Sequence, residues 1–219
     1  MTGGAGGPGG QRTGRAAALV LFLAYLPYYL NDFVNMTVTD YVAWVWLDYA
    51  QRSLAVAVVL YALWRGFISR ADAGLVRVPV GPFLAWTVGT AGAAMAYLCL
   101  SEFVLAPYFP KGSLGSAPFD PDSPLFRFDL WFGLALVGFS EELVCRGLAL
   151  TVLRRRFSLP VAAVLSGVLF SLMHWSLSAH TLADAFVYGM IFVPAVLATG
   201  SIWPTTVVHF LVNFVLYQM

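Results

Sequence analysis

The chain has 219 residues, of which 60% are hydrophobic and only 11% are charged, and its formal net charge is +1. A mean hydropathy of +0.78 exceeds what a soluble core needs, and repeated long apolar runs are typical of a polytopic helical membrane protein. The near-neutral net charge gives no indication of a nucleic-acid partner, and none is expected. Cys99 and Cys145 lie in apolar runs without a Cys-x-x-Cys motif, which excludes a zinc knuckle or a redox motif.

The apolar runs predict an all-α fold, a polytopic transmembrane helical bundle of about seven spans. A Gly-rich tail over residues 1–15 is predicted to be disordered, and residues 16–219 to form a single membrane domain. Residues 41–47 could be an interfacial aromatic helix or an extension of the second span, and Asn31, Asp32 and Asn35 are expected to meet water. The predicted spans are residues 16–30, 50–64, 81–105, 129–153, 159–175, 181–198 and 202–217.

Basic and less basic connections alternate between the predicted spans. The basic residues on one side are Arg12, Arg15, Arg65, Arg70, Arg77, Arg154, Arg155 and Arg156. The other side carries mainly Asp32, Asp40, Asp48, Asp120 and Asp122. The positive-inside rule then predicts a cytoplasmic N-terminus for a multi-pass protein of the cell membrane.

The fourth predicted span carries ionisable side chains in an otherwise apolar stretch. They are Glu141, Glu142 and Arg146, and each charge at a bilayer centre costs about 2.5–3.5 kcal/mol on insertion scales. Glu142 and Arg146 are four positions apart, in the favourable order for an ion pair. Glu141 is rotated by about 100° and is expected to point into a cavity as a free carboxylate. Gly138, one turn earlier, is expected to leave room beside it.

Two later spans each add one polar stripe. Phe170 and His174 share a face of the fifth span, and His209 and Asn213 share a face of the last one. A carboxylate desolvated among apolar helices is a useful general base for activating water, and a neighbouring histidine can relay the proton. A second histidine and an amide can donate hydrogen bonds to an oxyanion. The pattern therefore predicts a hydrolytic site where three helices meet.

These motifs together resemble a known family. Glu-Glu-x-x-x-Arg from Glu141, Phe-x-x-x-His from Phe170 and His-x-x-x-Asn from His209 follow one another on separate apolar helices. This is similar to the CPBP family, the CAAX prenyl proteases and bacteriocin-processing (Abi) proteins, which are described as intramembrane metalloproteases. The resemblance covers about residues 129–217, the expected catalytic core. It implies an intramembrane endopeptidase in the lipid bilayer that hydrolyses a peptide bond of a membrane-associated protein or peptide.

The resemblance also implies roles for individual residues. Glu141 would activate water with the help of His174, the ion pair beside it would support it, and His209 and Asn213 would stabilise the oxyanion. Phe170 would pack beside the first histidine. The catalytic residues so implied are Glu141, Glu142, Arg146, His174, His209 and Asn213.

The residues leave the metal question open. Glu141, His174 and His209 could be three zinc ligands that leave one coordination position open, so Zn²⁺ is a candidate cofactor. The chain has no His-Glu-x-x-His pair, and Asn213 would be an unusual zinc ligand. A water molecule held by the glutamate and a histidine is therefore favoured over a metal ion.

Two other functions fit parts of the pattern. In a serine protease that resembles the rhomboids, Ser140 would be the nucleophile and His209 its base. A non-hydrolytic membrane protein, such as a transporter or an immunity or partner protein, would keep the buried polar cavity for binding. His180 and Asp184, four positions apart, are interpreted as a helix entrance at the membrane interface and not as a site.

Overall fold

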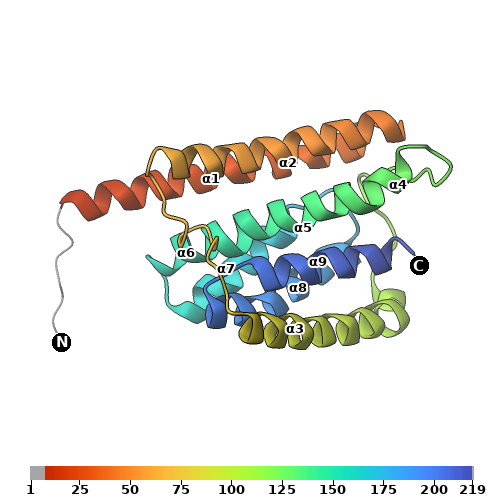
Figure 1. Cartoon of the computed structure of the whole chain (residues 1–219). Helices are drawn as coiled ribbons and strands as arrows, with labels where there is room; N and C mark the ends of the chain where they lie inside the picture. Colours follow the sequence, from red (N-terminus) through yellow and green to blue (C-terminus); the bar gives the residue numbers. More distant parts are fainter. Residues whose placement is uncertain (1–7, 219) are drawn as a thin grey trace.

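A computed structural model describes residues 8–218, and every regular element in this range is a helix, as the sequence predicts. Figure 1 shows α1 (Pro8–Thr37) and α2 (Tyr41–Trp64) as an antiparallel pair along one side of the bundle. The side chain of Asp40 accepts a hydrogen bond of 2.7 Å from the backbone N–H of Ala43 and so caps the start of α2. Helix α3 (Val80–Leu100) lies along the opposite side of the bundle.

The middle of the molecule is built on one long helical stretch from residue 126 to residue 154. Its consecutive parts are α4 (Phe126–Phe128), η3 (Asp129–Gly133), α5 (Leu134–Glu142), η4 (Leu143–Ala149) and α6 (Leu150–Arg154). Both η3 and η4 are π-helical, and such turns occur frequently at functional sites. The stretch agrees closely with the predicted fourth span.

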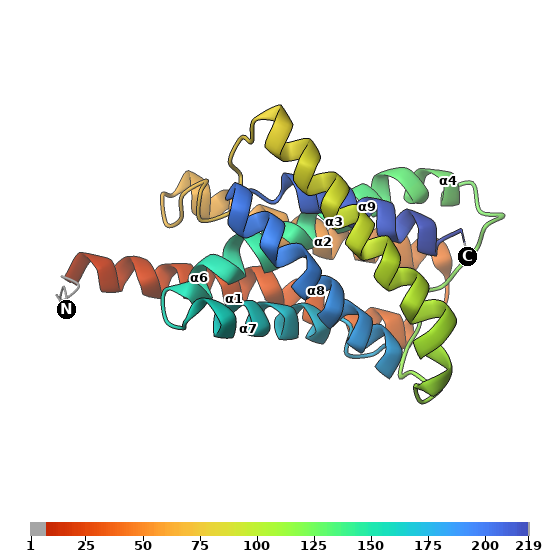
Figure 2. The ribbon, with the colours of Figure 1, turned by 90° about the horizontal axis from the view of Figure 1, so that it is seen from below.

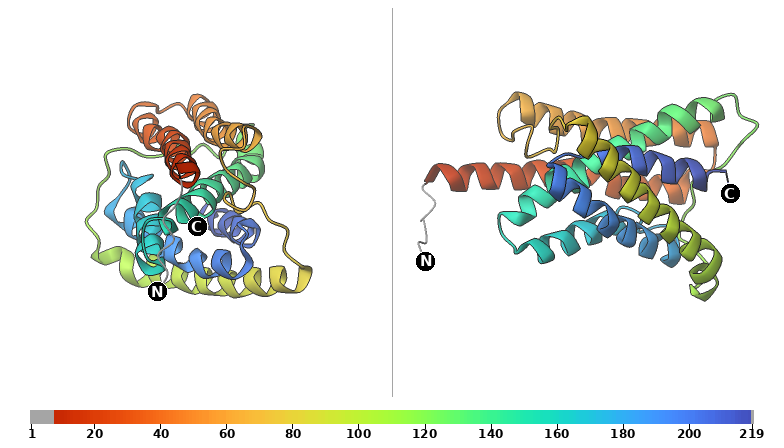
Figure 3. Two further views of the ribbon diagram at one scale, coloured as in Figure 1. Left: turned by 90° about the vertical axis from the view of Figure 1, so that its left-hand side faces the viewer. Right: turned by 60° about the horizontal axis from the view of Figure 1, so that its bottom comes forward.

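Three further helices complete the bundle. They are α7 (Leu159–Leu172), α8 (Ala179–Thr199) and α9 (Trp203–Leu216). Helix α3 continues through a π-helical turn, η1 (Ser101–Leu105), and a 3-10 turn, η2 (Ala106–Tyr108). Figure 2 shows α3 crossing α8 and α9 obliquely, and Figure 3 shows the bundle end-on.

Close helix packing depends on glycine at two places near the polar residues. A Cβ atom added to Gly189 of α8 would lie 3.1 Å from the Cα atom of Gly167 on α7. One added to Gly138 of α5 would lie 3.2 Å from backbone atoms of Thr206 and Phe210 on α9. Small residues let membrane helices approach closely. The space beside Gly138 is thus used by α9.

Length and hydropathy place the bundle in a membrane. Three helical segments are long and apolar enough to cross it, namely Arg15–Thr37, Val80–Tyr108 and Ala179–Thr199. The apolar helices α7 and α9 have 14 residues each, or about 21 Å, which is shorter than a hydrocarbon core of about 30 Å. The protein is therefore a helical membrane protein, while the number of spans, the cell membrane and the orientation of the N-terminus remain predictions.

The N-terminal part differs from the sequence prediction. Residues 8–15, predicted to be disordered, form the first turns of α1, because extending an existing helix costs far less than nucleating one. Residues 1–7 lie outside the described range. Residues 31–35 also belong to α1 and do not all meet water, since Asp32 is fully buried. Residues 41–47 extend the second span and do not form a separate helix.

Candidate active site

The ion pair predicted on the fourth span is present. The Nη1 atom of Arg146 lies 3.1 Å from Oε1 of Glu142, and both side chains are completely buried. The guanidinium carbon of Arg146 also lies 3.7 Å from the ring centroid of Phe170 and 5.3 Å from that of Phe192. A buried charge needs such partners, because losing hydration costs several kcal/mol per ion.

Glu141 is not the free carboxylate that the sequence suggested. Arg52 of α2 donates from Nη1 to Oε1 of Glu141 at 2.5 Å and from Nε to Oδ2 of Asp48 at 2.7 Å. Asn31 of α1 donates a hydrogen bond of 2.9 Å to the other oxygen of Asp48. The two N-terminal helices therefore supply a counter-charge that the motif in the fourth span does not contain.

His209 lies between the two glutamates. Its Nε2 atom is 3.6 Å from Oε2 of Glu141, and its Nδ1 atom is 3.1 Å from Oε1 of Glu142. Among residues 15–218, Oε2 of Glu141 is buried without a hydrogen-bond partner. One carboxylate oxygen is thus fixed by Arg52, whereas the other faces the histidine with a free lone pair.

His174 sits in the turn that follows α7. Its ring packs edge-on against Phe170, with ring centroids 5.4 Å apart, as the resemblance implied. Its Nδ1 atom lies 3.1 Å from the backbone oxygen of Phe170, a geometry that suits an Nδ1–H donor. The other ring nitrogen, Nε2, is then the acceptor.

A cavity of about 280 Å³ brings the predicted residues together. Glu141, His174, His209 and Asn213 all line it, and so does Arg52. The fourth, fifth and seventh predicted spans therefore meet at one pocket, as the sequence predicts. The roles of these residues remain proposals.

Ser140 does not contribute to this pocket. Its side chain is fully buried, and its hydroxyl group donates a hydrogen bond of 3.3 Å to the backbone oxygen of Val137, on the same helix. The described residues that line the pocket do not include Ser140. The arrangement offers no support for a serine nucleophile.

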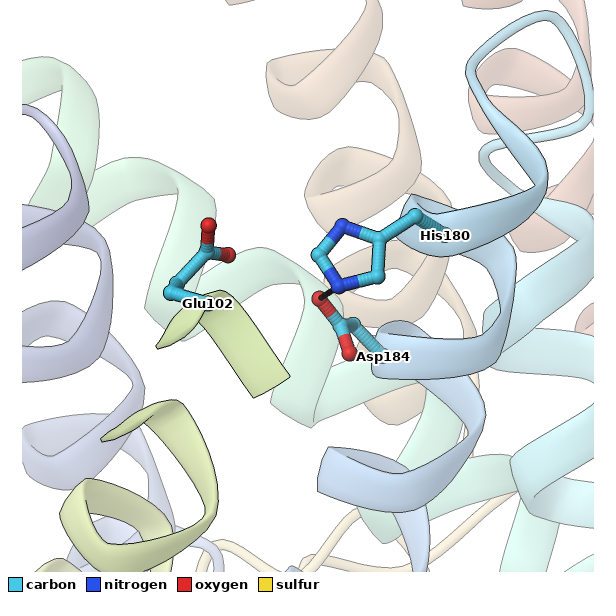
Figure 4. Close-up of side chains that lie close together, drawn as sticks. All are labelled: Glu102, His180 and Asp184. Carbon is cyan, nitrogen blue, oxygen red and sulfur yellow. Dashed lines mark ion pairs between the residues drawn. The ribbon is translucent and has the colours of Figure 1, made fainter. Parts of the chain in front are cut away.

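A second cavity, of about 200 Å³, adjoins the first and shares His174, His209 and Asn213 with it. Its wall also contains Glu102, His180 and Asp184. In the described part of the chain, the potential metal-ligand atoms of these last three residues all lie within 4.8 Å of one another (Figure 4).

The three zinc ligands that the sequence suggests, Glu141, His174 and His209, are not as close together as Glu102, His180 and Asp184 are. Among residues 15–218, the potential ligand atoms of Glu141, His174 and His209 do not all lie within 4.8 Å of one another. One oxygen of Glu141 is occupied by Arg52. These three residues do not fit a zinc ion in the present arrangement.

The turn that carries His174 is fastened to distant segments through Ser176. The backbone N–H of Ser176 donates to Asp32 of α1 at 3.1 Å, and its hydroxyl group donates to the same carboxylate oxygen. The carbonyl oxygen of Ser176 accepts hydrogen bonds of 2.8 and 2.9 Å from the backbone N–H groups of Leu114 and Gly115. The position of His174 therefore depends on α1 and on the connection before α4.

Sequence reasoning missed Asp48, Arg52 and Glu102 as contributors to the site region. The signal was present, because Asp48 and Arg52 are ionisable, four positions apart and next to an apolar run, as are Glu142 and Arg146. Glu102 lies inside a predicted span, where a charged side chain is costly, as it is for Glu141 and Glu142.

A family model described as "Rce1-like: Type II CAAX prenyl endopeptidase Rce1-like" matches residues 123–215. This range contains all six implied catalytic residues, and α1, α2 and α3 lie outside it. No curated protein and no solved structure matches the chain. This match confirms the resemblance seen in the motifs: residues 123–215 are similar to the Rce1-like family of type II CAAX prenyl endopeptidases.

Proposed function

We propose that the chain is an intramembrane endopeptidase that hydrolyses a peptide bond of a membrane-associated protein or peptide. One observation carries the proposal: Oε2 of Glu141 is buried, has no hydrogen-bond partner among residues 15–218 and lies 3.6 Å from His209 Nε2 at the wall of a cavity. A carboxylate oxygen with a free lone pair can take a proton from a water molecule in that cavity. The family match supports the same reaction class.

Glu141 and His174 would hold the attacking water molecule. Arg52 binds Oε1 of Glu141, so that the carboxylate is fixed in orientation and Oε2 stays available. His174 uses Nδ1 on the backbone of Phe170 and keeps Nε2 as a second acceptor for water. Two acceptors at one cavity can orient water and remove its proton as the scissile carbonyl carbon is attacked.

His209 and Asn213 would stabilise the oxyanion. They lie four positions apart on α9, so they project from the same face at successive turns into the same cavity. Donors that are already in place act strongly on a developing negative charge in a site shielded from water. Glu142 would accept a hydrogen bond from Nδ1–H of His209 at 3.1 Å, and Arg146 would in turn fix Glu142. To donate to the oxyanion from Nε2 at the same time, His209 would act as an imidazolium that carries both protons.

This proposal uses no metal ion in water activation. A cation on the available oxygen of Glu141 would lie close to the positive charge of Arg52, whose Nη1 atom is 2.5 Å from the other oxygen, and the two charges would repel each other. Glu141, His174 and His209 would also have to move closer together to reach the bond lengths of about 2.0–2.2 Å that zinc requires. We expect chelators to leave peptide hydrolysis by this site unchanged.

The decisive experiment compares Glu141→Gln with Ser140→Ala. Membrane proteomes from cells carrying either the wild type or Glu141→Gln identify peptides whose cleavage needs the carboxylate, and one such peptide is then assayed in liposomes. Glu141→Gln should lower the rate by about 10²–10⁴-fold, whereas Ser140→Ala should retain it. Thermal unfolding in detergent checks that both variants fold.

Other outcomes would point elsewhere. Equal hydrolysis by Glu141→Gln and wild type rejects the proposed base. Loss of hydrolysis in a folded Ser140→Ala variant favours the serine mechanism. A chain that hydrolyses nothing but takes up a solute in a Glu141-dependent way is a transporter.

A further inference from the structure

Glu102, His180 and Asp184 form a cluster that the proposed reaction does not use. Their potential ligand atoms all lie within 4.8 Å of one another, and each residue is partly buried. Glu102 lies in η1, directly after α3, and the other two lie one turn apart near the start of α8 (Figure 4). The cluster therefore joins two helices that are far apart in the sequence.

The two carboxylates of the cluster have no lysine or arginine partner in the described part of the chain. Across residues 15–218, neither Glu102 nor Asp184 forms an ion pair with lysine or arginine, and His180 is the one ion-pair partner of Asp184. The described residues lining the adjoining cavity include no lysine or arginine either. Two carboxylates that are partly withdrawn from water among apolar helices are costly, and a bound cation would offset this cost.

Hydrogen bonds to one oxygen of Asp184 fix the orientation of its carboxylate and leave the other oxygen available for a metal ion. Its Oδ1 atom accepts hydrogen bonds of 2.7 Å from the hydroxyl group of Tyr97 and 2.5 Å from that of Ser101. Its Oδ2 atom is left over and lies 3.4 Å from Nε2 of His180. Two ligands of a tetrahedral zinc ion, each at about 2.0–2.1 Å, lie about 3.3–3.4 Å apart. Partners behind a ligand fix its orientation at metal sites.

We propose that Glu102, His180 and Asp184 bind a divalent transition-metal ion, with Zn²⁺ preferred. One imidazole and two carboxylates are ligands that zinc accepts, and three protein ligands leave a fourth position open. Binding replaces the 2.8 Å contact between Nε2 of His180 and the hydroxyl group of Ser101, so this histidine binds as neutral imidazole. Mg²⁺ keeps its waters and prefers octahedral oxygen sites, so it binds more weakly.

The ion would clamp the end of α3 to the start of α8. Glu102 stands in a π-helical turn, a feature that often marks functional sites, and this turn brings Ser101 as well as Glu102 to the cluster. The adjoining cavity also contains His174, His209 and Asn213. The metal site is therefore next to the proposed active site but uses none of its residues.

Metal binding to the full chain purified in detergent tests this proposal. After removal of metal with a chelator, the wild type should bind one Zn²⁺ per chain by calorimetry and elemental analysis. His180→Ala, Asp184→Asn and Glu102→Gln should each weaken binding at least tenfold. Asp122→Asn, which changes an exposed carboxylate in a connection, and Glu141→Gln are the matched controls and should bind Zn²⁺ as the wild type does.

Thermal unfolding separates binding from misfolding. Zn²⁺ should raise the unfolding temperature of the wild type and of Glu141→Gln but not that of His180→Ala, while all chains unfold at similar temperatures without metal. The proposal is overturned if the wild type binds no Zn²⁺ at micromolar concentrations. It is equally overturned if binding is lost in Glu141→Gln and retained in the three cluster variants.

Discussion

The helices before residue 110 and those after residue 125 contribute to the site in different ways. The later helices contain every residue of the three motifs and nearly the whole range of the family match. The earlier helices lie outside the matched range, yet α2 supplies Arg52 to Glu141, and Tyr28 and Asn31 of α1 line the same cavity. The motifs thus identify the groups proposed to react, whereas the unmatched helices set their charge and surroundings.

The two regions also use different kinds of ion pair. Glu142 and Arg146 belong to one continuous helical stretch and are completely buried. Arg52 joins α2 to α5, and its side chain remains 12% exposed. Loss of the first pair should therefore affect folding most, and loss of the second should affect the reaction more than folding.

The largest effect is expected from Arg146→Met. This change leaves Glu142 buried beside His209 without its cation, which should lower the free energy of unfolding by about 3–5 kcal/mol. Thermal or denaturant unfolding in detergent measures it. Arg155→Met, at an exposed pair, is the control, with an expected change of about 0–1 kcal/mol. Equal changes in both variants would show that burial does not distinguish these pairs.

Asn213→Ala should have the next largest effect, and it should act on the reaction and not on folding. Loss of one donor to an oxyanion lowers kcat by about 10²–10³-fold. Steady-state rates on the peptide identified with Glu141→Gln measure this. A change confined to KM would mean that the amide binds the substrate and does not stabilise the oxyanion.

Arg52→Met tests the contribution of the unmatched helices. Loss of a charge-assisted hydrogen bond of about 1.5–3 kcal/mol corresponds to a decrease of about 10–150-fold in kcat/KM. Arg52→Lys keeps the charge without the forked geometry and should recover part of the rate. Wild-type kcat/KM in Arg52→Met would restrict the active site to the later helices.

The smallest effect concerns Asp72, in the connection that ties the two regions together at the surface. Burial raises the pKa of this carboxyl, but hydrogen bonds from the backbone and hydroxyl groups of Ser69 and the charge of Arg155 outweigh burial, so that the pKa is lowered. A lowered pKa stabilises the fold above the unfolded value of about 3.9 and loses this contribution as pH falls through the folded value.

Unfolding at several pH values measures this contribution. Asp72→Asn should lower stability at pH 7 by about 0–1 kcal/mol, and its difference from wild type should vanish well below pH 4. Asp122→Asn, in an exposed connection, is the control and should show no such dependence. A difference that grows towards low pH would have the wrong sign for this pair.

The sequence predicts much of the C-terminal half because its signals are local. Helical spacing was sufficient to pair Glu142 with Arg146 and to place His209 and Asn213 on one face of α9. It could not place Arg52 against Glu141, since that contact joins positions 89 residues apart. Helical spacing also could not reveal that Asp32, which was expected to meet water, is buried. Its hydrogen-bond partner, Ser176, lies 144 residues later in the chain.

The hydrogen bonds around Ser176 have a consequence for synthesis of the chain. Asp32 and the backbone groups of Leu114 and Gly115 leave the ribosome long before Ser176 does. The turn carrying His174 can reach its final position only when Asp32, Leu114 and Gly115 are already in place to bind Ser176. The nascent protein is therefore without a complete set of proposed hydrolytic groups until its last helices have been made.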